Sequence, residues 1–365
     1  MLSPRRLLRA VEQLFSDPPA LEATSLPDAY PFAHRHVLIE SEEVATPETE
    51  DMSFNDFHAY HDSATYKTLP VYTALLEDVR FCPVNNVIMT PNRTVIRETA
   101  GPGAKTFCVD ERAITRHNRV ESLAGISTAF RCSFDNYYHL LIDHLSRFDL
   151  LNQSYFSQFD QINVLCPGGL RPTEEFFVSK LRPSNVNIVP LEDDVLYKPE
   201  RYLFLSFPTR RSSAYIPGPY VERLRARVLC DEAGARSRRL FISRQKAVER
   251  NLRNEDALME RLHSLGFQRV VLEDLPPSEQ IRLFQETEIV VAPHGAGLAN
   301  LLFSTDATVL ELQPSPYVAP HYYLLCKRMG HDYQYLTHEA PHVDDDFATS
   351  PQAVVDQLSF AKRSA

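Results

Sequence analysis

Residues 289–300 read Ile-Val-Val-Ala-Pro-His-Gly-Ala-Gly-Leu-Ala-Asn, and this stretch predicts the fold class of the chain. Its first four residues are apolar without interruption, which is typical of a β-strand buried on both faces. A turn that contains glycine follows, and we expect the apolar residues 298–303 to form a helix. A buried strand that leads through a tight turn into a helix is the repeating unit of parallel α/β sheets.

The segments on either side repeat this alternation of strand and helix. We predict strands at residues 240–242, 270–272, 309–312 and 333–336, and helices at 254–265, from Ser278 onward, and at 320–329. Asn254 is the expected N-cap of the first helix, and Gly266 is its expected stop. The alternation predicts a parallel sheet with right-handed crossovers, in which ligands bind at the carboxyl ends of the strands.

The first half of the chain is less regular. The predicted elements are helices at residues 134–151 and 174–181, strands at 163–166 and 187–190, and an apolar run at 202–207. We expect roughly the first 100 residues to be irregular structure with short helices and strands, because they show little sustained periodicity. Prolines at 208, 217 and 219 mark a domain boundary. The predicted domains are an N-terminal α/β domain at 1–207, a linker at 208–218, a C-terminal Rossmann-like domain at 219–340, and an acidic loop and helix at 341–365 that packs back on the N-terminal domain.

The composition excludes several classes of protein. A chain of 365 residues with 44 % hydrophobic and 24 % charged residues is typical of a soluble globular protein with two domains. Its formal net charge of -10 argues against a nucleic-acid partner, which requires a net positive surface. The six cysteines form no CxxC pair, so no zinc ribbon or redox motif is predicted, and we expect free thiols in a reducing cytosol.

No stretch of the sequence approaches the roughly 20 apolar residues of a transmembrane helix. Residues 1–17 carry Arg5, Arg6 and Arg9 among apolar residues, and charges inside the apolar stretch argue against a signal peptide. This segment is either a helix packed on its own domain or a basic amphipathic helix with weak contact to an anionic membrane.

The turn after strand 289–292 has the features of a phosphate site. Glycines at 295 and 297 let backbone amides approach a phosphate closely, and the start of the following helix adds partial positive charge. The turn is not the G-x-G-x-x-G dinucleotide fingerprint, because Asn300 occupies the sixth position. A tight packing turn is the alternative, but such a turn does not need the imidazole of His294.

A second candidate follows strand 240–242, where Ser243 and Arg244 begin a basic loop that includes Arg250. Between residues 236 and 253 the chain has seven basic residues and one acid, against its overall sign. Guanidinium groups bind phosphate with forked hydrogen bonds. A solvated basic loop is the alternative, but the position at the carboxyl end of a strand favours a phosphate site.

The third candidate is the helix at 134–151. At about 100° per residue, Asn136, His139, Asp143 and Arg147 fall on one narrow stripe. Solvated helix faces are usually filled by Lys, Glu and Gln, so this composition favours the lining of a cleft. An aspartate one turn from a histidine can set the tautomer and basicity of the imidazole, so the pair His139–Asp143 is a candidate for proton transfer.

The fourth candidate, Glu311, interrupts the apolar strand 309–312. A carboxylate is costly to bury without partners, so we expect it either to accept two ribose hydroxyls or to form a salt bridge with an arginine. Acid runs occur at 192–194 and 344–346, and the second formally fits a D-x-D metal motif, but its setting is typical of a surface loop. We therefore expect arginine and a helix dipole, rather than a divalent cation, to meet the charge of a phosphate.

Together these motifs resemble glycosyltransferase family 61, whose members are often labelled capsular polysaccharide biosynthesis proteins. The matching stretches are Asn136-Tyr137-Tyr138-His139 with Asp143, Ile242-Ser243-Arg244 with Arg250, Asn254 and Glu255, Pro293-His294-Gly295-Ala296-Gly297-Leu298 with Asn300, and the strand that carries Glu311. Their order and spacing match over residues 120–340. One departure is Ala299, where the family often has threonine.

The resemblance implies two facing Rossmann-like domains of the GT-B type and transfer of a sugar, with inversion, from a nucleotide-sugar to a glycan or lipid-linked acceptor. The donor is usually a UDP-sugar, and no metal or other cofactor is obligatory. The implied phosphate-binding residues are Ser243, Arg244, Arg250, His294, Gly295, Ala296, Gly297 and Leu298; the implied nucleoside-side residues are Glu311, Asn254, Glu255 and Asn300; the implied acceptor-side residues are His139, Asp143, Asn136 and Arg147. The chain is similar to prokaryotic, cytosolic members, at most peripheral at the inner face of the membrane.

We therefore expect a single displacement in which His139 or Asp143 takes the proton of the acceptor hydroxyl. Three other readings stay open at the level of sequence. The chain could bind a nucleotide-sugar without turnover, as a scaffold of a polysaccharide assembly system. It could be a sugar-nucleotide epimerase or hydrolase on the same fold. A Rossmann oxidoreductase is the third, and the missing G-x-G-x-x-G argues against it.

Overall fold

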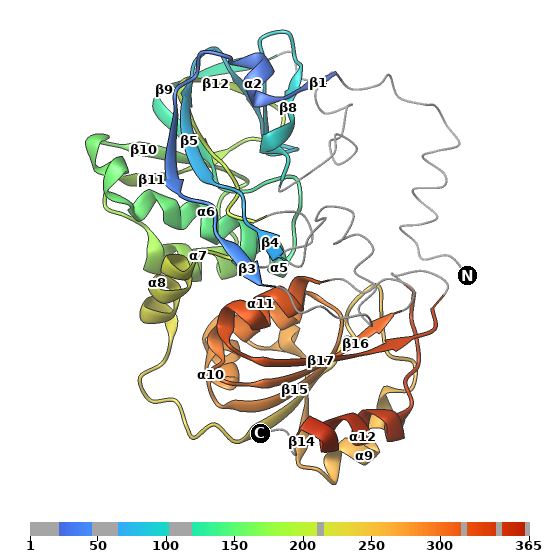
Figure 1. Ribbon diagram of the computed structural model, residues 1–365. Helices are drawn as coiled ribbons and strands as arrows, with labels where there is room; N and C mark the ends of the chain where they lie inside the picture. Colours follow the sequence, from blue (N-terminus) through green and yellow to red (C-terminus); the bar gives the residue numbers. More distant parts are fainter. Residues whose placement is uncertain are drawn as a thin grey trace, which may run out of the picture. The chain divides into compact units, whose positions relative to one another are not determined.

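The computed structural model describes residues 22–45, 65–101, 119–209, 215–314, 320–340 and 345–361 (Figure 1). The chain divides into two compact units. The N-terminal unit contains the described residues of 22–44, 67–101 and 119–209, and the C-terminal unit contains nearly all of the rest. The predicted helix at residues 1–17 and the centre of the predicted linker, residues 210–214, lie outside the described residues.

The C-terminal unit is built on a five-stranded sheet in the order β14-β13-β15-β16-β17. All four pairings are parallel, as the alternation of strands and helices predicts. The strands are β13 (Arg238–Ile242), β14 (Phe267–Val270), β15 (Thr287–Pro293), β16 (Thr308–Pro314) and β17 (Asp332–His338). Counted along the chain this is the order 2-1-3-4-5 of doubly wound sheets, which bind ligands where the order reverses, between the first and third strands. The expected ligand position is therefore the carboxyl ends of β13 and β15.

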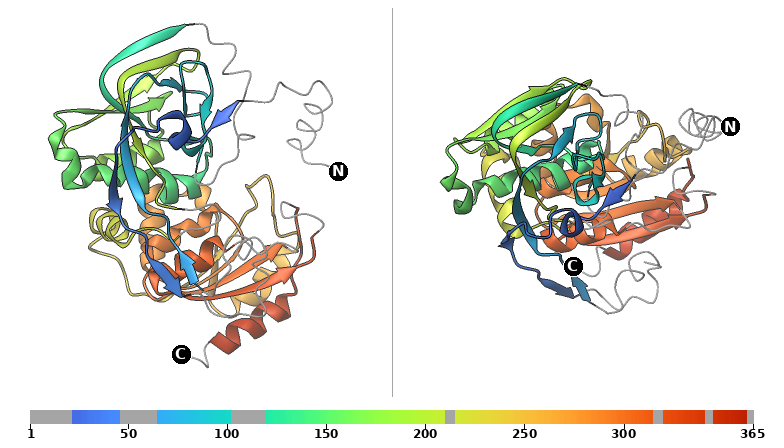
Figure 2. Two further views of the ribbon diagram at one scale, coloured as in Figure 1. Left: turned by 45° about the horizontal axis from the view of Figure 1, so that its top comes forward. Right: turned by 90° about the horizontal axis from the view of Figure 1, so that it is seen from above.

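Helices cover both faces of this sheet (Figures 1 and 2). The helices α9 (Glu255–His263) and α12 (Pro351–Ala361) pack together on one face. On the other face lie α10 (Pro277–Gln285), the 3₁₀ helix η7 (Ala296–Phe303) and α11 (His321–Met329). The central strands β15 and β16 are almost fully buried, which explains their largely apolar sequences, whereas the edge strands β14 and β17 are more exposed and carry polar residues.

The predicted placement of the C-terminal helix on the N-terminal domain is wrong. Val354 and Leu358 of α12 are buried against Leu258 and Leu262 of α9, in one core cluster of the C-terminal unit. Both pairs are spaced four residues apart, so each helix presents a matching apolar stripe to the other. The C-terminal segment is thus part of the nucleotide-side fold that was predicted for 219–340.

The N-terminal unit contains a mixed sheet of ten strands, so it departs from the Rossmann-like order predicted for it. Four strands, β12-β9-β10-β11, are parallel neighbours, whereas β5, β6, β7 and β8 pair with antiparallel partners. The bounds are β1 (Ala23–Thr24), β2 (Arg35–Ile39), β5 (Val71–Leu76), β6 (Arg80–Cys82), β7 (Val87–Met89), β8 (Val95–Ile96), β9 (Val120–Ala129), β10 (Ile162–Pro167), β11 (Val186–Leu191) and β12 (Leu196–Leu205). The short strands expected among roughly the first 100 residues are present in its described part, and they join this sheet: at two to six residues they are too short to show a period.

Several predicted elements differ in detail. The predicted helix at 134–151 is divided into α5 (Tyr137–His139), a π turn at Leu140–His144, and α6 (Leu145–Asp149). Residues 296–303 form a 3₁₀ helix, β14 lies at 267–270 instead of 270–272, and α10 is capped by Pro276 before Ser278 is reached. The remaining described helices and strands are α2 (Leu26–Ala29), β3 (Glu43–Ala45), β4 (Thr65–Lys67), α7 (Pro172–Leu181) and α8 (Gly218–Val228).

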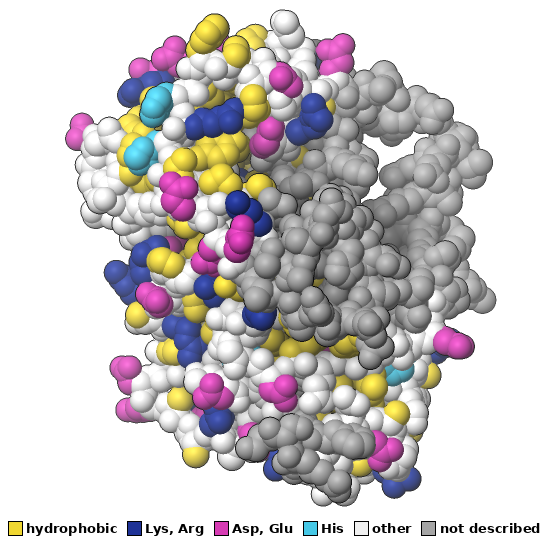
Figure 3. Space-filling model, viewed as in Figure 1, with side chains coloured by type: hydrophobic (Ala, Val, Ile, Leu, Met, Phe, Trp, Pro, Cys, Tyr) yellow, Lys and Arg dark blue, Asp and Glu magenta, His cyan; other side chains and the backbone are white. Residues whose placement is uncertain are grey.

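On the face drawn in Figure 3, acidic and basic side chains of the described residues are interspersed, and no continuous basic stripe of the kind that nucleic-acid binding requires is visible. No helix among the described residues has the length and apolar character needed to cross a membrane.

Candidate active site

The two predicted phosphate motifs meet at the carboxyl ends of neighbouring strands. Phe241 of β13 is paired with Val291 of β15, so the residues that follow each strand emerge side by side. The guanidinium of Arg244 packs directly on Gly295: a Cβ atom at Gly295 would lie 1.8 Å from an Arg244 Nη. The backbone of Gly295 is extended, so the glycine is required by the arginine side chain and not by its own torsion angles. Arg244 and Gly295, which are 51 positions apart in the chain, thus form one site at the point where the strand order reverses.

Arg244 is a partly buried cation with spare hydrogen-bonding capacity. One Nη donates to the carbonyl of Glu249 at 2.8 Å, and the Nε–H is buried without a hydrogen-bond partner among the described residues. Burial, with the neighbouring charge of Arg250, lowers the pKa of Arg244 to about 10, so the guanidinium remains protonated at neutral pH. A buried positive charge is costly without an anionic partner. This side chain is therefore built for a negatively charged ligand.

The turn itself is held by packing on both sides. A Cβ at Gly297 would lie 2.8 Å from Leu272 Cδ1, so glycine allows η7 to approach the sheet closely. Asn300 is fully buried, and its Nδ2 donates to Gln280 Oε1 at 3.0 Å and to the Gly297 carbonyl at 3.1 Å. The prediction that Asn300 faces a nucleoside is therefore wrong, because its amide ties η7 to α10.

Glu311 is also placed differently from the prediction. Its side chain is 0 % exposed, Oε1 lies 2.6 Å from His294 Nδ1, and Oε2 accepts a hydrogen bond from Tyr333 at 2.5 Å. Both oxygens are engaged by protein groups, and neither partner is the arginine of the predicted salt bridge. Burial raises the pKa of the Glu311 carboxyl to about 8. We therefore expect Glu311 to affect a ligand indirectly, through the position and protonation of His294 and Tyr333.

A polar cavity of about 350 Å³ lies beside this site, at the start of α9. Ser243, whose Oγ donates to Glu255 Oε1 at 2.7 Å, connects the two. The cavity is lined by Gln245, Asn251, Leu252, Arg253, Asn254, Glu255, Asp256, Arg269 and Asp346. Two of the predicted nucleoside-side residues, Asn254 and Glu255, are among them, and Asn251 Oδ1 is buried without a hydrogen-bond partner among the described residues.

Asn254 also has a structural role. It is the N-cap residue of α9 by position, but its side chain makes no capping hydrogen bond. Instead its amide donates to the Thr349 carbonyl at 2.7 Å and accepts from the Thr349 N–H at 3.0 Å. Asn254 thus fastens the C-terminal segment to the cavity wall, and this correction leaves Glu255 as the better placed of the two for a ligand.

In the N-terminal unit, His139 and Asp143 form the predicted pair. His139 Nδ1 lies 2.6 Å from Asp143 Oδ2, and Thr209 donates to the other carboxylate oxygen. Asn136 is the N-cap of α5, and its Oδ1 accepts from the His139 N–H at 3.0 Å. The His139 side chain is 20 % exposed and that of Asp143 is 2 % exposed. The sequence left either residue as the base; the structure makes His139 the accessible one and Asp143 its orienting partner.

Arg147 does not belong to this site. Its side chain is buried, one Nη donates to the carbonyls of Ala129, Phe130 and Arg131 at 3.1, 2.9 and 2.8 Å, and its guanidinium lies over the ring of Phe207. The π turn explains the error. The Leu145 N–H donates to the Leu140 carbonyl, five residues back, which shifts the helix phase between Asp143 and Arg147. The prediction that Arg147 faces an acceptor is wrong.

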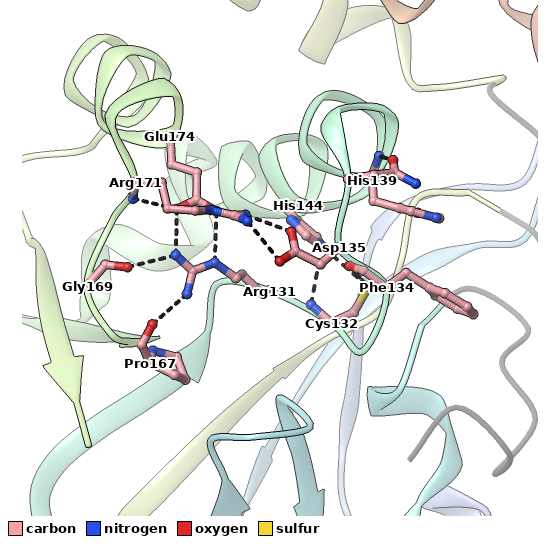
Figure 4. A network of polar contacts seen from close by, with 11 residues as sticks. Arg131, Cys132, Phe134, Asp135, His139, His144, Pro167, Gly169, Arg171 and Glu174 are labelled. Atoms are coloured by element: carbon pink, nitrogen blue, oxygen red, sulfur yellow. Dashed lines mark hydrogen bonds and ion pairs between the residues drawn. The ribbon is translucent and has the colours of Figure 1, made fainter. Parts of the chain in front are cut away.

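Sequence reasoning missed a network of ion pairs that holds the loop before α5 (Figure 4). The buried carboxylate of Glu174 accepts from Arg131 Nε at 2.8 Å and Nη2 at 2.5 Å, and it also binds Arg171. Arg171 in turn makes two hydrogen bonds to Asp135, the residue before Asn136. Burial alone would raise the pKa of the Glu174 carboxyl, but the hydrogen bonds from Arg131 and Arg171 lower this pKa to about 2. No local pattern reveals the network, because its members come from separate segments.

Comparison with known proteins agrees with this assembly. Residues 137–310 match the Glycosyltransferase 61 family. The matched segment begins two residues before His139 and includes Ser243, Arg244 and the glycine turn, whereas Glu311 lies one residue beyond it.

Three plant proteins are similar to parts of the chain. A beta-1,2-xylosyltransferase of Arabidopsis thaliana is 26 % identical over 131 residues, which is 32 % of this chain and 23 % of that protein. The beta-1,2-xylosyltransferases XAX1 and RCN11 of Oryza sativa subsp. japonica are 29 % identical over 155 residues and 46 % identical over 48 residues. These two matches cover 36 % and 13 % of this chain, and 27 % and 9 % of the rice proteins. The chain thus aligns with about a quarter or less of each relative, and the findings support a glycosyltransferase.

The structural role of Arg147 can be tested by Arg147→Met, which removes the guanidinium from three buried carbonyls. Hydrogen bonds from a charged donor contribute ~1.5–3 kcal/mol each, so we expect the N-terminal unit to lose about 3 kcal/mol of unfolding free energy in urea denaturation. Arg182→Met, at an exposed residue of the same unit, should change it by no more than ~0.5 kcal/mol. Unchanged stability with reduced activity in Arg147→Met would contradict this role.

Proposed function

We propose that this chain is an inverting glycosyltransferase that moves a sugar from a UDP-linked donor to a glycan or lipid-linked acceptor, in the synthesis of a polysaccharide or glycoconjugate. The observation that carries the proposal is the partly buried Arg244 guanidinium on Gly295, at the reversal of the strand order. The family match and the three xylosyltransferase relatives support it. Because all three relatives are named for xylosyl transfer, xylose is the sugar that we propose first, and the enzyme would then be a pentosyltransferase.

The donor diphosphate would lie between Arg244, Arg250 and the start of η7. Two guanidinium groups and the backbone amides of Gly295–Gly297 provide positive charge and directed donors. Ser243, bonded to Glu255, would fix the loop on which Arg244 stands. These groups supply the charge that a divalent cation supplies in other nucleotide sites, so we propose that the reaction has no obligatory metal.

The nucleoside would occupy the cavity of about 350 Å³ at the start of α9. Its lining carries both Arg253 and Arg269 and the carboxylates Glu255, Asp256 and Asp346, so its charges nearly balance. A balanced polar lining suits an uncharged nucleoside better than a phosphate. Asn251 Oδ1, buried without a partner among the described residues, would accept a hydrogen bond from the base or the ribose.

His139 would act as the general base. Its Nδ1 faces Asp143, so Nε2 would take the proton of the acceptor hydroxyl. The acceptor oxygen then forms a bond to the anomeric carbon as the bond to the diphosphate oxygen breaks on the opposite face, which inverts the configuration. The leaving diphosphate keeps the electron pair, and Arg244 and Arg250 stabilise its charge. Asp143 would stabilise the imidazolium that forms.

We also propose that the reaction takes place in the cytosol, with no more than peripheral contact to the membrane. The described cysteines, Cys82, Cys132, Cys166, Cys230 and Cys326, are free thiols, which fits a reducing compartment.

The base is tested by Asp143→Asn, which keeps the shape of the side chain but removes its charge. We expect kcat for xylosyl transfer to fall ~10²–10⁴-fold with little change in the KM for the donor. Asp160→Asn, at an exposed aspartate of the same unit, is the matched control and should retain full activity. Near-normal turnover in Asp143→Asn would overturn the assignment, and donor binding without any turnover by the natural chain would indicate a scaffold.

The donor site is tested by thermal unfolding with UDP-xylose in EDTA. A ligand at 100 times its dissociation constant should stabilise the fold by ~2.7 kcal/mol. Gly295→Ala should lose most of this stabilisation, because its Cβ would displace Arg244, whereas Gly218→Ala should retain it, because there the nearest atom, of Arg328, lies 3.8 Å away. Stabilisation that requires Mg²⁺, or that survives in Gly295→Ala, would contradict the proposed site.

A further inference from the structure

Beneath the proposed phosphate site lies a buried acid that the proposed mechanism does not use. Glu311 Oε1 is 2.6 Å from His294 Nδ1, and Tyr333 donates to Oε2. The Gln313 side chain is also hydrogen-bonded to this carboxylate. None of these partners carries a fixed positive charge. Apart from the electrostatic attraction of Arg250, the charge of the carboxylate is offset by a proton, either its own or one held by the imidazole.

The position of that proton decides what His294 presents to a ligand. With a proton between Oε1 and Nδ1 the pair is neutral, and Nε2 carries the remaining hydrogen, or the pair is a carboxylate and an imidazolium with both nitrogens protonated. In either form Nε2 is a donor. When one proton is lost, Nδ1–H faces a carboxylate, Nε2 becomes an acceptor, and the pair has a charge of minus one. A neutral donor unit thus becomes an anionic unit.

This charge lies next to the groups that would bind the diphosphate. His294 precedes Gly295, on which Arg244 packs, and Tyr322 donates to the Gly295 carbonyl at 2.6 Å. Arg250 is close enough to lower the pKa of Glu311 by electrostatic attraction, although burial has the larger effect and raises it to about 8. A negative pair here would repel the diphosphate and compete with it for the two arginines.

Titratable groups on α11 and β17 also lie close to the pair. From α11, Tyr322 and Cys326 face it, and burial raises the pKa of each well above its usual value. Tyr333 of β17 behaves in the same way. These three groups stay neutral between pH 6 and 9. The ring centroid of His321, also on α11, lies 5.7 Å from that of His294, so the test includes a variant of His321.

We infer that Glu311 is a positioning residue that retains one proton with His294, and that the donor diphosphate binds to the protonated form of this pair. The inference rests on the proposed donor site. Because the bound state favours the protonated pair, donor affinity is highest below the pKa of the pair and falls as the pH rises through it. For one proton, the fall approaches tenfold per pH unit.

Isothermal titration calorimetry of the full chain with UDP-xylose between pH 6.5 and 9.5 tests this. The diphosphate of UDP-xylose is a diester and does not titrate in this range, whereas the uracil imide and Arg244 lose protons only toward its upper end, so a slope below pH 9 belongs to other groups of the protein. We expect the affinity of the natural chain to fall at least tenfold across the range. Glu311→Gln keeps the size of the side chain and a partner for His294 but cannot exchange a proton, so its affinity should be flat over the range in which the natural chain declines.

Two control variants test whether the pH dependence of donor affinity comes from Glu311. Glu288→Gln, at a partly exposed carboxylate on β15, should keep the slope, and so should His321→Gln. A slope that disappears in His321→Gln, or persists in Glu311→Gln, would overturn the inference. If Glu311→Gln does not fold, the natural chain titrated at pH 8.5 in buffers of different ionisation enthalpy should take up close to one proton per donor bound, and no uptake would overturn it.

The outcomes also separate this inference from the function on which it rests. Tight binding that does not change with pH would remove the role of Glu311 and leave the donor site intact. No binding of UDP-xylose by the natural chain at any pH, including pH 6.5, would contradict the proposed donor itself.

Discussion

Arg244 lies against the bare Cα of Gly295, and the rest of the proposed donor site depends on this contact. The contact exists because β13 and β15 are neighbours in the sheet although α9, β14 and α10 separate them in the chain. It buries a guanidinium whose Nε has no protein partner among the described residues. Folding thus places a partly desolvated cation at the reversal of the strand order, and an anionic ligand would offset the cost of its burial.

Each unit also contains a histidine whose Nδ1 lies 2.6 Å from a carboxylate oxygen, and the surroundings give the two pairs different chemistry. In the N-terminal unit the His139 ring is partly exposed, so the carboxylate of Asp143 can prepare it for proton transfer. In the C-terminal unit the Glu311 carboxylate is completely buried, and its pairing with His294 favours retention of a proton. A histidine paired with a carboxylate thus suits a general base in the first unit and a neutral positioning pair in the second.

Local sequence patterns predict most strands and helices of the C-terminal unit, because a buried parallel strand is a short apolar run and a packed helix has apolar residues at regular spacing. They also find His139 with Asp143, which are one helical turn apart, and Arg244 with the glycine turn, since both follow strands. The errors arise where distant segments decide the outcome. The π turn changes the direction in which the Arg147 side chain points. The Asn300 amide donates a hydrogen bond to Gln280 of another helix, and Glu174 forms ion pairs with Arg131 and Arg171, which lie in separate loops. In the N-terminal unit, most of the early strands are too short to show their period.

Hydrogen exchange of the full chain, followed by mass spectrometry with and without saturating UDP-xylose, tests the central claim most directly. If the donor diphosphate binds on Arg244 and the glycine turn, exchange should slow in peptides that cover residues 243–254 and 294–303, which follow β13 and β15. Peptides that cover β6–β8 should not change. Protection confined to other segments, with binding established independently, would contradict the site proposed here.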